Sequence, residues 1–370
     1  MHNRYTRAAA AGALTVALTA SAAALAATGS FLGPLHTFSH VASAVPAGGP
    51  AKGDVNPYGL VVVPRSAGRL VRGDVLISNF NDKQNLQGTG SSVVEISPSG
   101  HQRVFAVVPR PTATPAVGLT TALAVLRSGF VIVGSLPAPG GNSARATAGA
   151  LTVLNSAGHV AATLRAPDIN GPWDMTWVDG GSHATLFVTN VLNGTVAAHG
   201  HVVRRGTVVR IDLSVGGGAV HVTSNRVIAT GFGEHTDPNA LVVGPTGVGL
   251  GRGDVLYVAD SNANRIAAVP GAMTRMTVLA GAGMTVAHGG PLNDPLGLTI
   301  APNGNIVSAN GGDGRMVETT PAGGHAAVRN LIPNGGGDLF GLAVAPNHRS
   351  LYLVDDAGNG PSANSLALLH

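Results

Sequence analysis

A histidine flanked by two acids gives one short segment of the sequence the strongest potential for chemistry. The segment is Gly233-Glu234-His235-Thr236-Asp237. A histidine beside carboxylates can act as a general base or as a metal ligand. Glu234, His235 and Asp237 are therefore the candidates for catalysis. Because consecutive residues of an extended chain point in different directions, the alternative is an ordinary loop in which these side chains do not meet.

The elements that would position such residues repeat along the chain. Apolar runs recur at intervals of roughly 45–65 residues, a spacing typical of propeller blades. They begin at Pro57, Val117, Pro172, Pro238, Pro295 and Leu339. Further β-rich runs follow each one, separated by turns that often contain glycine, and four such runs make one antiparallel blade. The sequence thus predicts an all-β fold, a six-bladed β-propeller of four-stranded antiparallel blades.

The two ends of the chain complete each other in this scheme. The sixth unit stops after its third strand, Ser365–Leu369, and the segment Phe38–Val45 before the first unit resembles the missing fourth strand. If this N-terminal strand completes the last blade, the ring closes and neither end leaves an unpaired edge. Residues 37–370 are then a single propeller domain, which we expect to be monomeric.

The first residues have the layout of a secretory signal peptide. Arg4 and Arg7 precede the apolar stretch Ala8–Ala27, and Ala24-Leu25-Ala26 offers a cleavage pattern. Residues 1–27 are therefore predicted to be a signal peptide cleaved near Ala26, and residues 28–36 a linker. A retained membrane anchor is the alternative, because about 20 apolar residues can span a bilayer. With cleavage, we expect a secreted or cell-envelope protein without membrane attachment.

Composition excludes several classes of function. The chain has no cysteine, which excludes disulfides, thiolate zinc sites and cysteine nucleophiles. Only 11% of the residues are charged, and 22 Lys+Arg stand against 18 Asp+Glu, so no basic patch for nucleic acid is expected.

Polar residues gather at one end of the expected inner strands. Because strand direction alternates within a blade, the start of each first strand and the end of each second strand lie on the same face of the disc. The candidate ligand-binding residues on this face are Asn56, Asn79, Trp173, Asp174, Asn190, Asn239, Asp260, Asn310, Asp338 and Asp355. The alternatives are turn chemistry for the Asp and Asn residues and core packing for Trp173.

Four carboxylates of the same region are candidates for binding a metal ion. Oxygen ligands of this kind suit Ca²⁺ or another divalent cation, which is the cofactor that the sequence suggests. The candidates are Asp174, Asp237, Asp294 and Asp338.

Two segments resemble the NHL repeat of secreted bacterial β-propellers. One runs from Val278 through Gly289-Gly290-Pro291-Leu292-Asn293-Asp294-Pro295 to Asn305, and the other is Asp254–Ile266. The resemblance implies a six-bladed propeller. It leaves the function open, because similar propellers include binding proteins, lyases, lactonases and protein-interaction modules.

The resemblance and the polar face together suggest binding of a small ligand, a glycan or a protein partner at the mouth of the central channel. The alternative is a metal-dependent hydrolase or lyase, lactonase-like or streptogramin-lyase-like, at the same face. Lactonase and regucalcin propellers use a channel Glu, whereas of Glu95, Glu234 and Glu318 only Glu234 precedes an expected first strand. A lyase of that type would need histidines such as His199 and His201. A sugar-oxidising quinoprotein is a third interpretation, because those propellers are also six-bladed.

Overall fold

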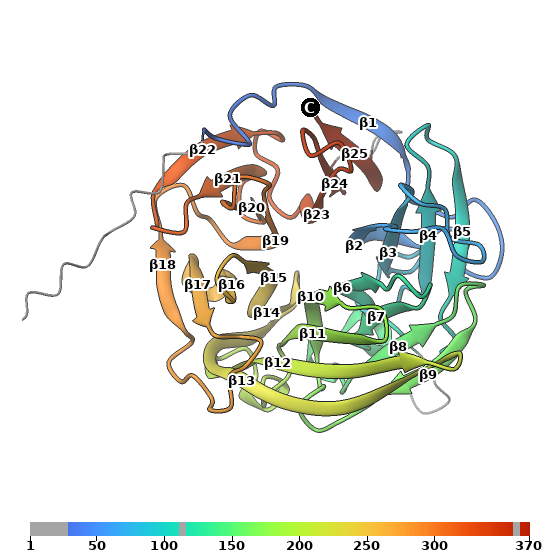
Figure 1. Ribbon diagram of the computed structural model, residues 1–370, viewed down its shortest axis with the longest axis horizontal. Coiled ribbons are helices and arrows are strands. Elements are labelled where there is room, and N and C mark those ends of the chain that lie inside the picture. The colour runs from blue at the N-terminus through green and yellow to red at the C-terminus, as the bar shows by residue number, and fades with distance from the viewer. Residues whose placement is uncertain (1–28, 111–115, 358–362) are drawn as a thin grey trace, which may run out of the picture.

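The computed structural model describes residues 29–110, 116–357 and 363–370. It confirms the six-bladed β-propeller, with six antiparallel sheets arranged around a central axis (Figure 1). The expected signal peptide, residues 1–27, lies outside the described residues. Within the described ranges, no helix is long and apolar enough to cross a membrane.

The strands follow one another from the axis outward in each blade. Blade one consists of β2 (Val55–Val62), β3 (Val75–Asn81), β4 (Ser92–Ile96) and β5 (Gln102–Val107). Blade two consists of β6 (Leu119–Val125), β7 (Val131–Ser135), β8 (Ala150–Leu154) and β9 (Val160–Leu164). Blade three consists of β10 (Pro172–Asp179), β11 (His183–Asn190), β12 (Val203–Gly216) and β13 (Ala219–Asp237), with β14 (Leu241–Val243) paired to the end of β13.

The other three blades have the same order. Blade four consists of β15 (Pro245–Gly251), β16 (Val255–Asp260), β17 (Arg265–Pro270) and β18 (Met284–His288). Blade five consists of β19 (Pro295–Ile300), β20 (Ile306–Asn310), β21 (Arg315–Thr319) and β22 (His325–Asn330). Blade six consists of β23 (Leu339–Val344), β24 (Leu351–Asp355), β25 (Ser365–Leu369) and β1 (Phe38–Ser43). The described residues also form four single turns of 3₁₀ helix, which are η1 (Pro139–Gly141), η2 (Ser143–Arg145), η3 (Val196–Ala198) and η4 (Ser261–Ala263).

The inner strands β2, β6, β10, β15, β19 and β23 all run in the same direction along the axis. We call the side of the disc on which they begin, at residues such as Pro57 and Pro172, the start face. The opposite side, on which they end at residues such as Val62, is the end face. Between blades, apolar residues of neighbouring sheets interlock, as Leu76 and Val93 of blade one do with Val131 of blade two. This packing holds the inner strands in place around the channel.

The predicted beginning of blade four is wrong. The inner strand of that blade starts at Pro245, whereas the residues after Pro238 form a hairpin with the end of β13. The Asp237 carboxylate caps this hairpin by accepting hydrogen bonds from the Asn239 amide (2.6 Å) and the Ala240 amide (3.1 Å). Pro238 and Pro245 both precede short apolar runs, so the sequence pattern does not tell which of them begins the inner strand. The structure assigns the start to Pro245, because β13 extends as far as Asp237 and pairs there with the residues after Pro238.

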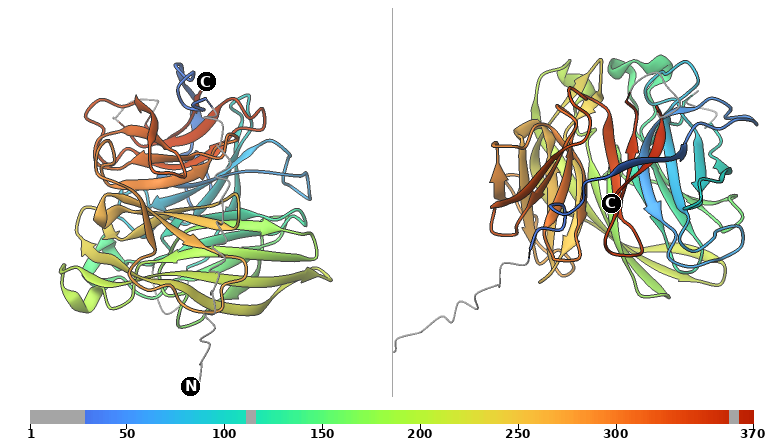
Figure 2. Two further views of the ribbon diagram at one scale, coloured as in Figure 1. Left: turned by 60° about the vertical axis from the view of Figure 1, so that its left-hand side comes forward. Right: turned by 90° about the horizontal axis from the view of Figure 1, so that it is seen from above.

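The N-terminal strand closes the ring as expected. β1 pairs with β25 in antiparallel register, with Phe38 opposite Leu369 and Ser43 opposite Ser365. In Figure 2 the blue N-terminal segment runs beside the red strands of blade six. The last blade therefore combines the two ends of the described chain.

Residues 29–36, expected to be a linker, pack against blade five. The carboxylate of Glu318 on β21 accepts hydrogen bonds from the Ser30 hydroxyl (2.5 Å) and from the amides of Phe31 (2.9 Å) and Leu32 (2.8 Å). It also accepts one from the Asn305 amide group (2.6 Å). Leu32 itself is fully buried in the core of blades five and six.

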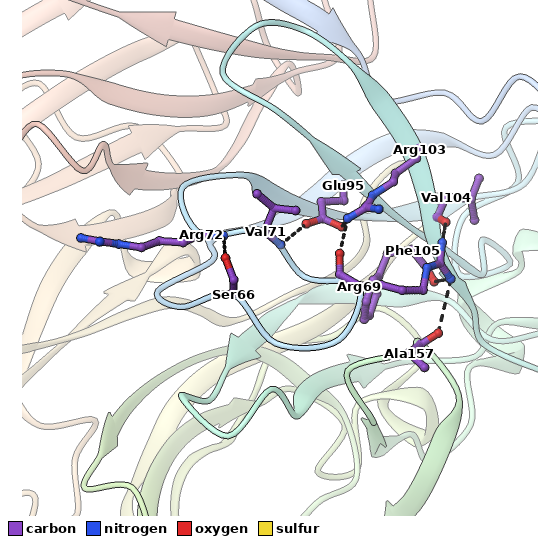
Figure 3. Close-up of polar contacts among 9 residues, drawn as sticks. All are labelled: Ser66, Arg69, Val71, Arg72, Glu95, Arg103, Val104, Phe105 and Ala157. Carbon is purple, nitrogen blue, oxygen red and sulfur yellow. Dashed lines mark hydrogen bonds and ion pairs between the residues drawn. The ribbon is translucent and has the colours of Figure 1, made fainter.

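Glu95 has the corresponding role in blade one. It lies on β4, where its carboxylate pairs with Arg103 (2.6 Å) and accepts a hydrogen bond from the Val71 amide (2.9 Å), as Figure 3 shows. In both blades, a buried glutamate on the third strand thus holds an irregular segment against the sheet.

Replacing Glu318 with Gln should destabilise the protein by about 1–3 kcal/mol, because its amide would present hydrogens to the donors of Ser30, Phe31 and Leu32. Burial opposes ionisation of Glu318, but the hydrogen bonds from Ser30, Asn305, Asn303 and Phe31 outweigh it and hold its pKa below the ordinary value. The stabilisation is therefore present above the pKa of the unfolded chain and is lost as pH falls through the lower folded value. Thermal unfolding between pH 7 and pH 3 measures this.

A matched control distinguishes weaker packing of the N-terminal segment from a general loss of stability. Glu95→Gln removes a buried carboxylate from blade one and should lower the melting temperature without faster hydrogen exchange at Leu32. Glu318→Gln should speed that exchange. Equal exchange in the two variants would contradict the role assigned to Glu318.

Candidate functional site

Every inner strand is irregular at its start. The register between each inner strand and the second strand of its blade shifts near the start, after the first residue in blades two to six and after Pro57, the third residue of β2, in blade one, which marks a β-bulge. In five blades the irregular pairs are Tyr58-Gly59, Trp173-Asp174, Thr246-Gly247, Leu296-Gly297 and Phe340-Gly341. Blade two has Thr120-Thr121-Ala122 instead.

Glycine stands at the second of these positions because neighbouring inner strands touch there. A Cβ atom on Gly297 would lie 2.0 Å from the carbonyl oxygen of Phe340 in the next blade, and one on Gly341 would lie 2.4 Å from that of Tyr58. None of these inner-strand glycines has a positive φ angle. Space, and not backbone conformation, therefore requires glycine at the bulges.

Blade three departs from this pattern by carrying Asp174 where four blades have glycine. One carboxylate oxygen of Asp174 accepts a hydrogen bond from the Met175 amide (2.8 Å). The other accepts one from the amide of Val248 on the inner strand of blade four (3.2 Å). The carboxyl group thus bridges two inner strands that elsewhere meet backbone to backbone.

Burial dominates the electrostatics of Asp174. It raises the pKa of this carboxyl group to about 8, against the hydrogen bonds from Met175 and Val248, which favour the ionised form. The group therefore keeps its proton to a higher pH than an ordinary aspartate does, and in its protonated form it can donate a hydrogen bond.

Asp174 lines a cavity of about 360 Å³ on the propeller axis. The walls come from the later halves of the inner strands, and their side chains are mainly apolar, although more of the surface that faces the cavity is polar than apolar; the apolar side chains include Leu60, Val62, Leu123, Met175, Trp177, Leu250, Leu298, Ile300, Leu342 and Val344. The side-chain hydroxyl groups are those of Thr121, Thr176 and Thr299. Because these residues lead to the ends of the inner strands, the cavity lies on the end-face side of the disc.

An aromatic cluster fills the axis on the other side of Asp174. The Tyr58 ring lies 4.1 Å from that of Phe340, 4.7 Å from Phe80 and 5.8 Å from Trp173, measured between centroids. Blades one, three and six supply these residues, so the rings meet across the axis. Trp173 is 2% exposed and offers no stacking face to solvent. The cluster separates the cavity from the start face.

Most of the predicted polar residues on the start face hold neighbouring backbone or side chains. Asp260 pairs with Arg265 at 2.7 Å. The Asn310 amide group donates to Pro291 O (2.8 Å), and that of Asn79 donates to Ala44 O (2.9 Å). Asn56 has a positive φ of 58°, and Asn190 is fully buried.

Asn239 does not lie on an inner strand. It is exposed in the β13–β14 hairpin, because blade four begins only at Pro245.

A second group of acids does gather on the start face. Burial, and then the charge of Asp338, raise the pKa of Asp355 to about 6. Burial, and then the charges of Asp338 and Asp355, raise that of Asp356 to about 7. Asp294 interacts with His235 and Asp237, and burial raises its pKa as well. These acids lie on the opposite side of the aromatic cluster from Asp174.

Glu234 and His235 are neighbours on β13, so their side chains point to opposite faces of the strand. Glu234 is fully buried, accepts a hydrogen bond from the Asn193 amide (2.9 Å), and has its pKa raised to about 7 by burial. Asp237 caps the hairpin. The three catalytic candidates therefore do not converge on one point.

His199 and His201 lie exposed in the loop after η3. In the part of the chain that the structure describes, no group of three or more His, Asp or Glu residues is placed to hold a metal ion. The metal candidates Asp174, Asp237, Asp294 and Asp338 are thus not brought together as one ligand set.

Comparison with known proteins supports the fold. No protein-family model matches the chain, and no curated protein matches it. Among solved structures, the PQQ-bound aldose sugar dehydrogenase of Streptomyces coelicolor is 14% identical, with a TM-score of 0.55 over 90% of this chain and 98% of that one. A gluconolactonase of Xanthomonas campestris is 14% identical, with a TM-score of 0.54 over 91% and 90%.

The calcium-binding protein regucalcin of Agrobacterium tumefaciens is 15% identical, with a TM-score of 0.54 over 86% of this chain and 91% of that one. At such identities the likeness shows the β-propeller fold alone.

The pH dependence of stability tests the environment of Asp174. Because its folded pKa is raised above the ordinary value of about 3.9, its protonated form stabilises the fold at low pH. This contribution is lost as pH rises through about 8. Asp174→Asn removes the titration, so the stability of the native protein relative to the variant should fall between pH 4 and 8. Parallel melting curves over that range would contradict this environment.

Proposed function

We propose that the protein binds a small organic molecule in the axial cavity, with Asp174 as its polar anchor. The observation that carries this proposal is the replacement of an inner-strand glycine by an acid in one blade of a repeating structure. Turn chemistry explains many Asp residues of this fold, but Asp174 lies in a strand, inside the channel, against a cavity. A volume of about 360 Å³ is within the range of small-molecule sites.

The chemistry of the walls indicates the class of ligand. A protonated Asp174 donates a hydrogen bond to a carbonyl, ether or hydroxyl oxygen, and the surrounding Leu, Val and Ile side chains favour an apolar body. Thr121, Thr176 and Thr299 and the polar part of the cavity surface offer further hydrogen-bond partners. A small neutral molecule that combines an apolar part with a few oxygen atoms therefore fits this cavity, whose volume is too small for a protein segment.

We also propose that the blades are NHL-type repeats and that the protein is exported. The NHL-type repeat is supported by the Asp254–Ile266 and Pro291–Asn305 motifs, and export by the composition of residues 1–27. Ser30 belongs to the packed segment 29–36 and is hydrogen-bonded to Glu318, so the proposed cleavage site near Ala26 comes before that segment.

A metal-dependent hydrolase or lyase is the second candidate. The charge of Asp338 favours it, because this charge raises the pKa of both Asp355 and Asp356 and a divalent cation would relieve the repulsion. The described structure does not bring the three carboxylates together as one ligand set, so a cation would have to draw them closer. This candidate places the chemistry on the start face, away from Asp174.

Binding to a panel of neutral ketones, lactones and alcohols of about ten non-hydrogen atoms tests the leading proposal. Trp177 lines the cavity, so its fluorescence reports occupancy. Asp174→Gly, which restores the glycine of the other blades, should weaken binding about tenfold by removing one hydrogen bond to the ligand. Asp294→Asn on the start face is the matched control and should bind normally. Failure of the whole panel, or equal binding by Asp174→Gly, would refute the proposal.

Thermal unfolding with EDTA and with added Ca²⁺ tests the second candidate. A cation that binds only the folded protein stabilises it by about 2.7 kcal/mol at 100 times its Kd. If the start-face acids hold a cation, Ca²⁺ should raise the melting temperature of the native protein but not of Asp356→Asn. An unchanged melting temperature and no stoichiometric metal by elemental analysis would remove this candidate.

A further inference from the structure

Both lysines of the chain line one hollow on blade one. Lys52 precedes β2, Lys83 follows β3, and the two are the chain's only lysines. Arg110, which follows β5, lines the same hollow, whose volume is about 540 Å³. This hollow lies on the start face, beside the ring of inner strands, and shares no lining residue with the axial cavity.

The three cationic side chains are exposed and form no ion pair with the acids of the described residues. The ion pairs of the described residues join Arg103, Arg210, Arg265 and Arg315 to acids, and none involves Lys52, Lys83 or Arg110. All 18 acids of the sequence lie in the described ranges, since residues 1–28, 111–115 and 358–362 contain none. The residues that line the hollow include three cationic side chains and two acidic ones, Asp54 and Asp82, so the cations outnumber the acids in the hollow.

Two acids line the hollow, and both hold its walls. A carboxylate oxygen of Asp54 accepts hydrogen bonds from the Ser91 amide (2.8 Å) and the Ser92 amide (3.0 Å), and Asp54 is 5% exposed. A carboxylate oxygen of Asp82 accepts hydrogen bonds from the amides of Gln84 (3.0 Å) and Leu86 (3.3 Å). These bonds fix the loops before β2 and after β3.

The two loops are in close contact at Gly53. Its φ of +85° is a conformation that L side chains rarely adopt, and a Cβ atom there would lie 2.9 Å from Cβ of Lys83. Gly53 also donates its amide to Pro46 O (2.9 Å). The contact at Gly53 therefore fixes the two backbone segments that carry Lys52 and Lys83 relative to each other.

We propose that this hollow binds the phosphate group of a small phosphorylated molecule. Three cations suit a dianionic phosphate better than a monoanionic carboxylate, and lysine binds phosphate as a point charge. A hollow of about 540 Å³ exceeds the size of an inorganic phosphate ion and leaves room for an organic body. The exposed amide side chain of Gln84 lines the hollow and can donate hydrogen bonds to that body.

Calorimetric titration of the full chain with glucose 6-phosphate at low ionic strength tests this proposal. Glucose, inorganic phosphate and sodium gluconate serve as comparison ligands. We expect glucose 6-phosphate to bind more tightly than inorganic phosphate or gluconate, with an affinity that falls as salt is added, and glucose not to bind. The double variant Lys52→Gln, Lys83→Gln should weaken binding at least tenfold.

The double variant Arg127→Gln, Arg349→Gln is a charge-matched control, because both arginines are exposed in end-face loops. It should bind glucose 6-phosphate as the native protein does. Equal weakening in both double variants, an unchanged affinity in the lysine variant, preference for gluconate, or no binding at all would overturn the proposal. Asp174→Gly should leave this binding intact, so the test is independent of the axial cavity.

Discussion

The close approach of neighbouring inner strands around the axis determines the rest of this structure. Where Gly297 meets Phe340 and Gly341 meets Tyr58, no side chain fits between the strands. The inner strands are therefore in contact at these bulges, and the residues on either side of the bulges have different environments. Toward the start face, the preceding side chains meet across the axis as an aromatic cluster. Toward the end face, the strands leave a cavity.

This division separates two kinds of electrostatic environment within one channel. Asp174 is the only acid among the described residues that line the axial cavity, and its ionisation is opposed by burial. Asp355 and Asp356 lie on the opposite side, where mutual repulsion adds to the effect of burial. The rings of Tyr58 and Trp173 lie between the two groups.

The sequence predicted the architecture better than the site. Blade spacing and the pairing of Phe38–Ser43 with the C-terminal strand followed from turn residues and apolar runs, which act locally. Asp174 and Asp338 were expected in one ring because both lie near strand starts. Their separation depends on the direction in which bulged residues point, which no periodicity reveals. Alignment of Trp173-Asp174 with Phe340-Gly341 could have marked Asp174 as exceptional.

The pairing of the two chain ends has a consequence for the order of folding. Ser39 and His370, whose side chains lie 3.2 Å apart, are separated by 331 positions in the sequence. Closing so long a loop is entropically costly, and contacts of such separation form slowly. Blade six cannot be completed until the C-terminal strand has been synthesised. A chain that still lacks β25 therefore leaves the edges of β1 and β24 unpaired, and unpaired strand edges favour aggregation.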